Sequence, residues 1–361
     1  MFMDDTVDFL EEMPANVVKK VLQNADEGTR KTINQFLNYP ENSAGSLMTI
    51  EYVDLHDYFT VRKAMDYIRR TGIDKETVYT CYVIDDQRKL VGQVSLRKLI
   101  IAPESACIRD IMDTNIVSAA TTDDQEAVAD DFRRYDLTSI AVCDKEGRLV
   151  GIITIDDIVD VIQDENTEDI KKMAAIIPSD EDYMKTSVWS LVAHRLPWLM
   201  LLMISATFTS TIITHFETLL SGAVLLTAFI PMLMDSAGNS GSQTSVTVIR
   251  NLALGEIEMK DWPRVLVKEI GVAVVAGAAL AVVNFLRIII FTSTSTMIAA
   301  VVSITLFCTV IIAMIVGCLL PIGAKRLGFD PAVMASPMIT TIVDACSLMI
   351  YFLIASTMLG L

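Results

Sequence analysis

From residue 196 to its end the sequence is a succession of long apolar blocks separated by short polar breaks. The blocks cover residues 196–216, 219–248, 265–291, 297–320 and 333–360. Each block reaches the roughly 20 residues that an α-helix needs to cross the hydrocarbon core of a bilayer. None shows the alternation of a transmembrane β-strand. The sequence therefore predicts an all-α membrane domain of five helices.

The basic residues between these blocks predict an orientation. Arg195 precedes the first block, and the first break, the third break and the C-terminal tail have no lysine or arginine. The second break is surrounded by Arg250, Lys260, Arg264 and Lys268, and the fourth contains Lys325 and Arg326. Because basic loops stay on the cytoplasmic side, we expect the N-terminus inside and the C-terminus outside.

The charge of the chain lies in its N-terminal half. Residues 191–361 carry eight acidic and eight basic side chains, so the net charge of −16 belongs to residues 1–190. An acidic domain disfavours nucleic acid and anionic lipid surfaces as ligands and favours cations. The first residues lack the basic and apolar regions of a signal peptide. The six cysteines occur singly, which is typical of reduced, buried residues and not of a zinc site.

The N-terminal half contains an internal repeat. Both copies consist of a short strand, an amphipathic helix, a strand, a charged turn and then Leu-Val-Gly, at Leu90–Gly92 and Leu149–Gly151. A copy of about 60 residues buries too little surface by itself, so we expect the two to pack as one pseudo-symmetric α/β unit. The predicted segments are a helical N-terminal segment (1–40), the repeats (41–105 and 106–165), a connecting helix (166–190) and the membrane domain (191–361). Within the first segment the expected buried stripe is Leu10, Val17, Val18, Val21, Leu22, Ile33, Phe36 and Leu37.

Two ionisable side chains, Asp235 and Asp344, lie well inside apolar blocks. A carboxylate at the bilayer centre costs about 2.5–3.5 kcal/mol on insertion scales, so it normally faces a water-filled cavity or a bound cation. The alternative for each is a carboxylate at a helix end or at the membrane interface.

The second block contains the polar motif Gly-Asn-Ser-Gly-Ser-Gln, which begins at Gly238. Gly238 and Gly241 lower helix propensity in the middle of the membrane, so we expect the backbone to leave helical geometry there. Its free carbonyls, with the amides of Asn239 and Gln243, would offer neutral oxygen ligands. The alternative is a small-residue face for helix packing.

The last block contains Thr340, Thr341 and Asp344 on one helical face. Pro337 frees a backbone carbonyl one turn below. A site of oxygen ligands without histidine, cysteine or methionine selects hard cations such as Mg²⁺, Ca²⁺ or Mn²⁺. We expect two subunits to place two copies of Asp344 opposite each other, with Mg²⁺ held largely through its own hydration shell.

An acidic run joins the second repeat to the first apolar block. Seven carboxylates fall between Asp156 and Asp169, and Asp157, Asp160 and Asp164 share a helix face. The run is either a solvated face or a cation-sensitive lever. A dication that joined it to Asp124, Glu126 or Asp136 would hold the connecting helix in place.

In these motifs the chain resembles the MgtE family of bacterial magnesium channels and transporters. The resemblance implies a homodimer in the bacterial inner membrane, tandem CBS domains over 41–165, and a pore between the second and fifth membrane helices gated by cytosolic Mg²⁺. It assigns the pore carboxylate to Asp344 and the polar pore lining to Gly238, Asn239, Gly241 and Gln243, to which the shared helical face adds Thr340 and Thr341 as pore ligands. It assigns regulatory Mg²⁺ binding to Asp124, Glu126, Asp136, Asp157, Asp160, Glu165, Glu168 and Asp169.

The chain departs from the family pattern in two places. Family members usually have glycine two or three residues after the pore aspartate, whereas here Ala345, Cys346 and Ser347 follow. The family's N-terminal helical domain is also longer than residues 1–40. CBS pairs can bind adenine nucleotides, so ATP is a second expected ligand, with Thr154 and Asp156 placed to contact a ribose.

The functional hypothesis is passive Mg²⁺ uptake driven by the membrane potential. The alternative is exchange of a divalent cation for Na⁺ or H⁺, with Asp235 serving the coupling ion. A cation sensor without transport is a third class, which the paired polar motifs disfavour. An enzyme is not expected, because the chain has no HExxH, GxSxG or phosphate-loop motif.

Overall fold

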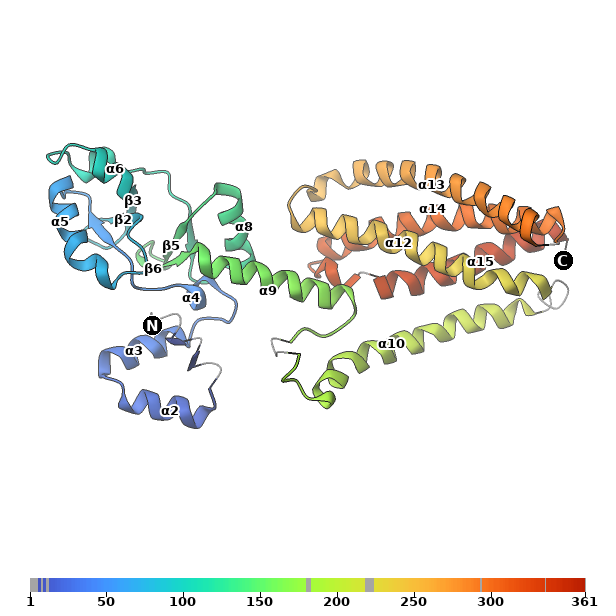
Figure 1. Ribbon diagram of the computed structural model, residues 1–361, viewed down its shortest axis with the longest axis horizontal. Helices are drawn as coiled ribbons and strands as arrows, with labels where there is room; N and C mark the ends of the chain where they lie inside the picture. Colours follow the sequence, from blue (N-terminus) through green and yellow to red (C-terminus); the bar gives the residue numbers. More distant parts are fainter. Residues whose placement is uncertain are drawn as a thin grey trace. The chain divides into compact units, whose positions relative to one another are not determined.

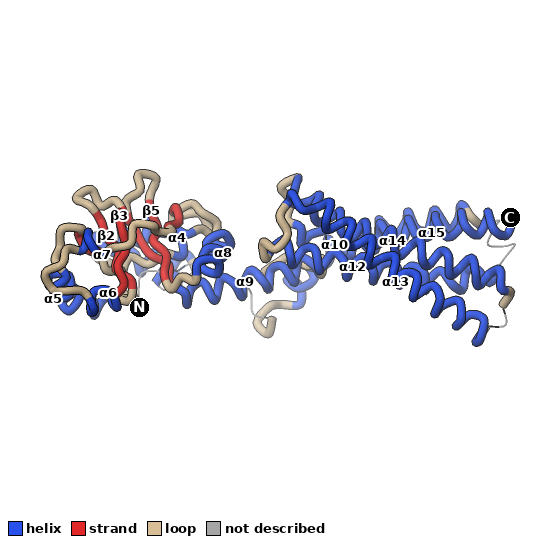
Figure 2. Tube along the Cα trace, turned by 90° about the horizontal axis from the view of Figure 1, so that it is seen from above, coloured by secondary structure: helices blue, strands red, loops and turns tan. Residues whose placement is uncertain are grey.

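The computed structural model describes residues 6–7, 9–10, 13–179, 183–217, 224–292, 294–334 and 336–360 (Figure 1). The chain divides into two compact units, Met1–Glu165 and Asn166–Leu361. The first is an α/β unit, and in Figure 2 all of its strands are flanked by helices. In the part that the structure describes, the second has helices and no strands. The predicted fold class, an α/β repeat pair followed by an all-α membrane domain, is confirmed.

Near the start of the first unit lie two short helices, α2 (Ala15–Asn24) and α3 (Glu27–Phe36). The carboxylate of Asp26 caps α3 by accepting a hydrogen bond from the N–H of Thr29 at 3.1 Å. Leu10, Ile33 and Phe36 of the predicted stripe are buried, and Val17, Val18 and Leu22 are half-buried. The prediction is wrong for Val21 and Leu37, which are exposed; Leu37 follows the last residue of α3 and so leaves its buried face.

The two repeats have the same order of elements. The first contains α4 (Ala44–Leu47), β1 (Asp54–His56), α5 (Val61–Thr71), the 3₁₀ turn η1 (Gly72–Asp74), β2 (Thr80–Ile84), β3 (Leu90–Ser95) and α6 (Leu96–Ile101). The second contains α7 (Ile108–Ile111), β4 (Ser118–Ala120), α8 (Gln125–Tyr135), β5 (Ser139–Cys143), β6 (Leu149–Thr154) and α9 (Ile155–Met173). In each sheet the first strand is parallel to the second, and the second is antiparallel to the third.

The two repeats pack through equivalent residues. Gln93, the residue after the first Leu-Val-Gly, exchanges two backbone hydrogen bonds with Asp113, and Ile152, after the second, does the same with Thr49. A side chain at Gly92 or Gly151 would come within 2.5 Å of a methionine sulfur, so only glycine permits this approach. Between the sheets lies a common core of Tyr52, Tyr82, Ile84, Ala141, Leu149 and Ile152. The pseudo-symmetric unit inferred from the repeat is therefore present.

The described residues of the second unit form five long helices. These are α10 (Val188–His215), α12 (Ile230–Ala253), α13 (Trp262–Phe291), α14 (Thr296–Arg326) and α15 (Ser336–Leu359), with 3₁₀ turns η2 (Val224–Phe229), η3 (Met259–Asp261) and η4 (Pro331–Met334). Four helical segments, Val188–His215, Met259–Phe291, Thr296–Arg326 and Pro331–Leu359, are long and apolar enough to span a membrane. The remaining helix, α12, has 24 residues, as many as α15, and carries the polar motif.

The membrane unit is organised around α14. Its small and branched residues, among them Ala299, Val302 and Val310, are fully buried in one cluster with residues of α12, α13 and α15. The hydroxyl of Tyr351 on α15 donates to the carbonyl of Leu226 at 2.9 Å, which fixes the turn that precedes α12. Because this turn occupies 224–229, the second helix begins at residue 230 and not at 219 as predicted. Residues 218–223 lie outside the described residues.

Candidate functional site

The polar motif of α12 forms a stripe along one side of the helix. Asp235, Asn239 and Gln243 follow one another at intervals of four residues, and all three are exposed in the single chain. The opposite side, which includes Leu233, Ala237 and Thr244, is buried against the other helices. An α-helix in the membrane that presents a carboxylate and two amides on one face is suited to line a water-filled passage.

The expectation that α12 unwinds at its glycines is wrong. The helix is continuous from Ile230 to Ala253. A Cβ at Gly238 would lie 3.1 Å from the Thr340 Cγ2 atom, and one at Gly241 would lie 2.8 Å from the Ile339 Cγ2 atom. The glycines therefore allow α12 and α15 to pack closely, as small residues do in membranes. Gly238 is buried, and its place in a continuous helix leaves Asn239 and Gln243 as the exposed oxygen ligands of the motif.

The predicted site residues of α15 lie beside this contact. The hydroxyls of Thr340 and Thr341 both donate to the carbonyl oxygen of Pro337 at 3.0 Å, so the two hydroxyl oxygens are oriented along the helix. Asp344, one turn further, is half-buried and close enough to Asp235 for the two carboxylates to repel each other. Within the described part of the chain neither carboxylate has a hydrogen bond or an ion pair. The fold thus brings together the two intramembrane acids that the sequence analysis selected.

A single chain does not complete a metal site here. Among the described residues there is no group of three or more histidine, cysteine, aspartate or glutamate side chains that could hold a metal ion. A dication between Asp235 and Asp344 would have to take its other ligands from threonine or amide oxygens, from water or from a second copy of the chain.

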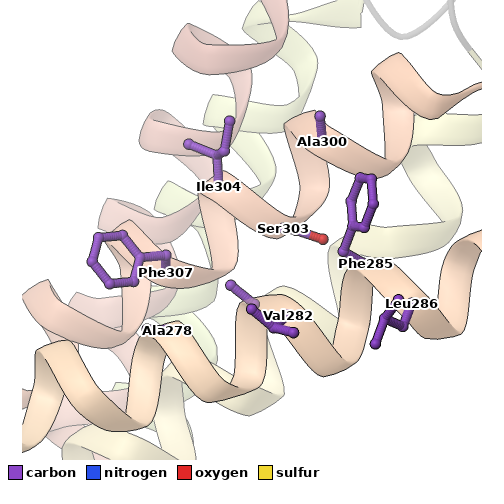
Figure 3. A pocket seen from close by; sticks show the side chains of 9 residues that line it. Ala278, Val282, Phe285, Leu286, Ala300, Ser303, Ile304 and Phe307 are labelled. Atoms are coloured by element: carbon purple, nitrogen blue, oxygen red, sulfur yellow. The ribbon is translucent and has the colours of Figure 1, made fainter.

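An apolar cavity of the membrane unit lies elsewhere and has a different chemistry. It has a volume of about 460 Å³ and is situated between α13 and α14, where Val282, Phe285, Ile304 and Phe307 surround it (Figure 3). Its only polar lining group is the hydroxyl of Ser303, which accepts a hydrogen bond from Asn284 at 3.4 Å. This cavity offers no ligand set for a cation.

The predicted regulatory carboxylates of the second repeat occupy both ends of α8. Asp124 caps its N-terminus by accepting from the N–H of Glu126 at 2.9 Å, whereas Asp136, in the left-handed conformation, follows its C-terminus. The Gln125 amide donates to Glu165 at 2.7 Å, so the start of α8 lies beside α9. This places Asp124 and Glu126 near Glu165, whereas Asp136 lies two residues before Thr138, whose carbonyl accepts from the N–H of Ile155, the first residue of α9, at 3.1 Å.

The acidic run lies on α9, which is a single helix of 19 residues. Asp157 accepts a hydrogen bond from the Thr154 hydroxyl at 2.8 Å, and Asp160 is exposed. Glu168 is paired with Lys172 at 2.8 Å, and Asp169 is half-buried. The carboxylates are therefore distributed along about 18 Å of helix, taking about 1.5 Å per residue.

Two polar contacts of the membrane unit were missed by the sequence analysis. Glu269 on α13 accepts a hydrogen bond from the buried Thr244 hydroxyl on α12 at 3.1 Å. Lys172 also reaches Asp330, which precedes α15. The position of Glu269, about one turn inside the apolar block that begins at residue 265, could have indicated the first contact. Nothing in the sequence indicates that Lys172 and Asp330, 158 positions apart, form a pair.

Family models match most of the chain. A model described as an MgtE intracellular N domain covers residues 1–42, CBS domain models cover 44–105 and 108–164, and a divalent cation transporter model covers 230–354. Magnesium transporter MgtE of Thermus thermophilus is 36% identical over 99% of this chain and 80% of its own length. The chain belongs to the MgtE family. Magnesium transporter MgtE of Bacillus subtilis is 35% identical over 98% of this chain and 78% of its own length.

Solved structures resemble the soluble part of this MgtE protein. The soluble part of a magnesium transporter is 38% identical over 46% of this chain and 64% of that chain, with a TM-score of 0.45. The cytosolic domain of the Mg²⁺ channel MgtE in complex with ATP is 39% identical over 45% of this chain and 66% of that chain, with a TM-score of 0.43.

Similarity to enzymes is partial. An inosine-5'-monophosphate dehydrogenase of Aquifex aeolicus is 33% identical over only 31% of this chain and 23% of its own length. The family to which the whole chain belongs consists of transporters and not of enzymes.

Proposed function

We propose that this MgtE-family chain conducts Mg²⁺ through the membrane as a passive channel. Three relatives that match 90% or more of the chain are named magnesium transporters. The observation that carries the proposal is the position of Asp344, an unpaired carboxylate in α15 beside Asp235 and the polar stripe of α12. A membrane potential of 100 mV supplies about 4.6 kcal/mol for a dication, so uptake needs no chemical fuel.

The pore of the proposed channel is completed by a second copy of the chain. The stripe of Asp235, Asn239 and Gln243 is exposed in one chain, and polar side chains facing lipid are costly. A symmetric dimer in which α12 and α15 of both copies meet would remove the stripe from lipid and place two Asp344 carboxylates about one passage. Two carboxylates and neutral oxygens favour a hard dication such as Mg²⁺.

The proposed location is the bacterial inner membrane, with the N-terminus in the cytoplasm. Support comes from the basic residues in alternate loops. The soluble unit then lies where cytosolic Mg²⁺ can reach its carboxylates.

The experiment that tests conduction is a flux assay in proteoliposomes. Wild-type protein should admit Mg²⁺ when the interior is negative, and Asp344→Ala should abolish the flux while the dimer still forms. Asp144→Ala, which removes an aspartate from a turn of the soluble unit, is the matched control and should conduct normally. Normal flux through Asp344→Ala would refute the proposed pore.

Gating by cytosolic Mg²⁺ is the second part of the proposal. The hydrogen bond between Gln125 and Glu165 supports it, because it brings the acidic end of α8 beside α9. A dication shared by Asp124 or Glu126 and the α9 carboxylates would restrain the connecting helix. Millimolar Mg²⁺ should then protect residues 160–190 from protease, and neutralising Asp157, Asp160 and Glu168 should remove that protection. Protection unchanged by these substitutions would instead indicate a solvated acidic face.

Two further ligands belong to the proposal. ATP is a candidate at the CBS pair, because the cytosolic domain of one related channel is described in complex with ATP. A coupling ion, Na⁺ or H⁺, is a candidate at Asp235, because that carboxylate is close enough to repel Asp344. Flux that required a Na⁺ or proton gradient would replace the channel by an exchanger.

A further inference from the structure

The last two turns of α9 belong to the membrane unit and end in an ion-pair cluster. The ammonium of Lys172 lies 2.8 Å from a carboxylate oxygen of Glu168, one turn earlier on the same helix. It also lies 2.7 Å from a carboxylate oxygen of Asp330, in the loop between α14 and α15. One cation thus joins a carboxylate of the connecting helix to a carboxylate at the entrance of the last membrane helix.

The three side chains of this cluster are partly buried, which distinguishes the cluster from an exposed surface ion pair. The side chains of Lys172, Glu168 and Asp330 are 24%, 36% and 35% exposed. Partial burial opposes the charge on Lys172, but the hydrogen bonds from its ammonium to Asp330 and Glu168 outweigh this effect and raise the pKa of Lys172 above its ordinary value. The lysine is therefore charged throughout the physiological range, and its interactions are screened less than those of exposed pairs.

Asp330 connects the cluster to the backbone that leads into α15. Its second carboxylate oxygen accepts a hydrogen bond from the N–H of Ala332 at 2.8 Å. Ala332 is buried in η4, and α15 begins two residues after that turn ends. A displacement of Lys172 would therefore act directly on the turn from which the helix of Asp344 starts.

A second contact joins the same part of α9 to the other helix of the proposed pore. The guanidinium of Arg250, in the last turn of α12, donates to the side-chain carbonyl of Asn166 at 3.3 Å. The final eight residues of α9 thus contact the cytoplasmic end of α12 through Asn166 and the approach to α15 through Lys172.

We propose that Lys172 is the tether that fastens the connecting helix to the turn before α15, and so couples the position of α9 to the helix that carries Asp344. Lys172 does not touch the conducted ion, so it is a positioning residue. Removal of its charge does more than delete a contact, because Glu168 and Asp330 then face each other as two half-buried like charges that repel. The coupling part of this inference rests on the proposed channel function, whereas the tether does not.

The tether is tested by hydrogen exchange of the full-length protein in detergent with EDTA, so that no dication contributes. Lys172→Gln should accelerate exchange of the amides in residues 166–173 and 330–334 by about three- to tenfold, the range expected for a local opening that loses one partly buried ion-pair cluster. Lys172→Arg should keep most of the protection. Lys145→Gln, at an exposed turn of the soluble unit, should change nothing.

If Lys172→Gln unfolds the protein, a double variant that exchanges the charges of residues 172 and 330 tests the tether instead. In Lys172→Glu with Asp330→Lys, one ammonium still lies between two carboxylates, so protection of 166–173 should return toward the wild-type value. Lys172→Glu alone should lose it. Unchanged exchange in both Lys172→Gln and Lys172→Glu would overturn the tether. These measurements involve no flux, so their failure is distinct from normal conduction by Asp344→Ala, which would refute the channel.

Coupling is tested in proteoliposomes by the Mg²⁺ concentration that halves the flux. Lys172→Gln should shift this concentration at least threefold, with the maximal flux changed by less than twofold, since the pore residues are intact. Lys172→Arg should restore the wild-type value. A lower maximal flux with an unchanged half-inhibitory concentration would overturn the coupling role, because it would indicate damage to the pore and not to the gate.

Discussion

The carboxylates of the soluble unit and those inside the membrane unit differ in whether they have hydrogen-bond or ion-pair partners. In the soluble unit, Asp85 and Asp144 close equivalent turns of the two repeats by accepting backbone N–H bonds at 2.8–3.0 Å, and Asp57 is paired with Arg109 at 2.6 Å. In the described part of the membrane unit, Asp235 and Asp344 have no such partner. A carboxylate that shapes a turn is accounted for by the fold. One that has no partner in the described part of a membrane helix is not accounted for by the fold of the single chain.

The two units also use glycine for close approach in different settings. Gly92 and Gly151 let the two repeats meet through backbone hydrogen bonds from β3 and β6 to the opposite repeat, whereas Gly238 and Gly241 let α12 and α15 pack through side-chain contacts. In the first case the contact stabilises a soluble core. In the second it sets the spacing of the two helices that carry the intramembrane acids.

The largest effect should come from the matched removal of one carboxylate in each unit. Asp344→Asn keeps the shape of the side chain but removes the charge that would attract a dication, and we expect Mg²⁺ flux to fall at least tenfold. Asp144→Asn should leave the flux within twofold of wild type. Equal losses of Mg²⁺ flux in Asp344→Asn and Asp144→Asn would contradict the difference between the carboxylates of the two units.

The next effect is on helix packing in the membrane unit. Gly241→Ala places a Cβ 2.8 Å from a methyl of Ile339 and 3.0 Å from the carbonyl of Ala313, and we expect a loss of stability of about 1–3 kcal/mol from overpacking. Gly323→Ala is the control, because its Cβ meets nothing within 4 Å and alanine favours the helix. Denaturant unfolding of the purified protein should separate the two. A destabilisation by Gly323→Ala equal to that by Gly241→Ala would contradict the packing argument.

A smaller effect is expected at the interface between the repeats. The hydroxyls of Tyr82 and Ser139 share a buried hydrogen bond of 2.9 Å. Tyr82→Phe leaves the Ser139 hydroxyl without this partner, so the free energy of unfolding of the soluble unit should fall by about 1–2 kcal/mol. Tyr79→Phe, at an exposed position, should have no effect. Calorimetry of the full-length protein would show the difference as a shift of the transition that belongs to the soluble unit.

The smallest effect should come from an exposed ion pair. Arg62 lies 3.8 Å from Glu104, with both side chains about three-quarters exposed. Arg62→Ala should change stability by less than about 0.5 kcal/mol, because solvent and salt screen such a pair. A loss above 1 kcal/mol in the same unfolding measurement would mean that surface charges contribute more to this unit than its burial implies.

The sequence alone determined the fold class, because apolar runs of membrane length and a repeated strand–helix–strand pattern each admit few structures. It also selected Asp235 and Asp344, since the cost of a carboxylate in lipid depends on local hydropathy. Tertiary structure decided what depends on neighbours distant in the chain. Gly238 and Gly241 do not unwind α12, because α15 fills the space beside them. The pairing of Lys172 with Asp330 likewise arises only when the chain folds back, and no local pattern encodes it.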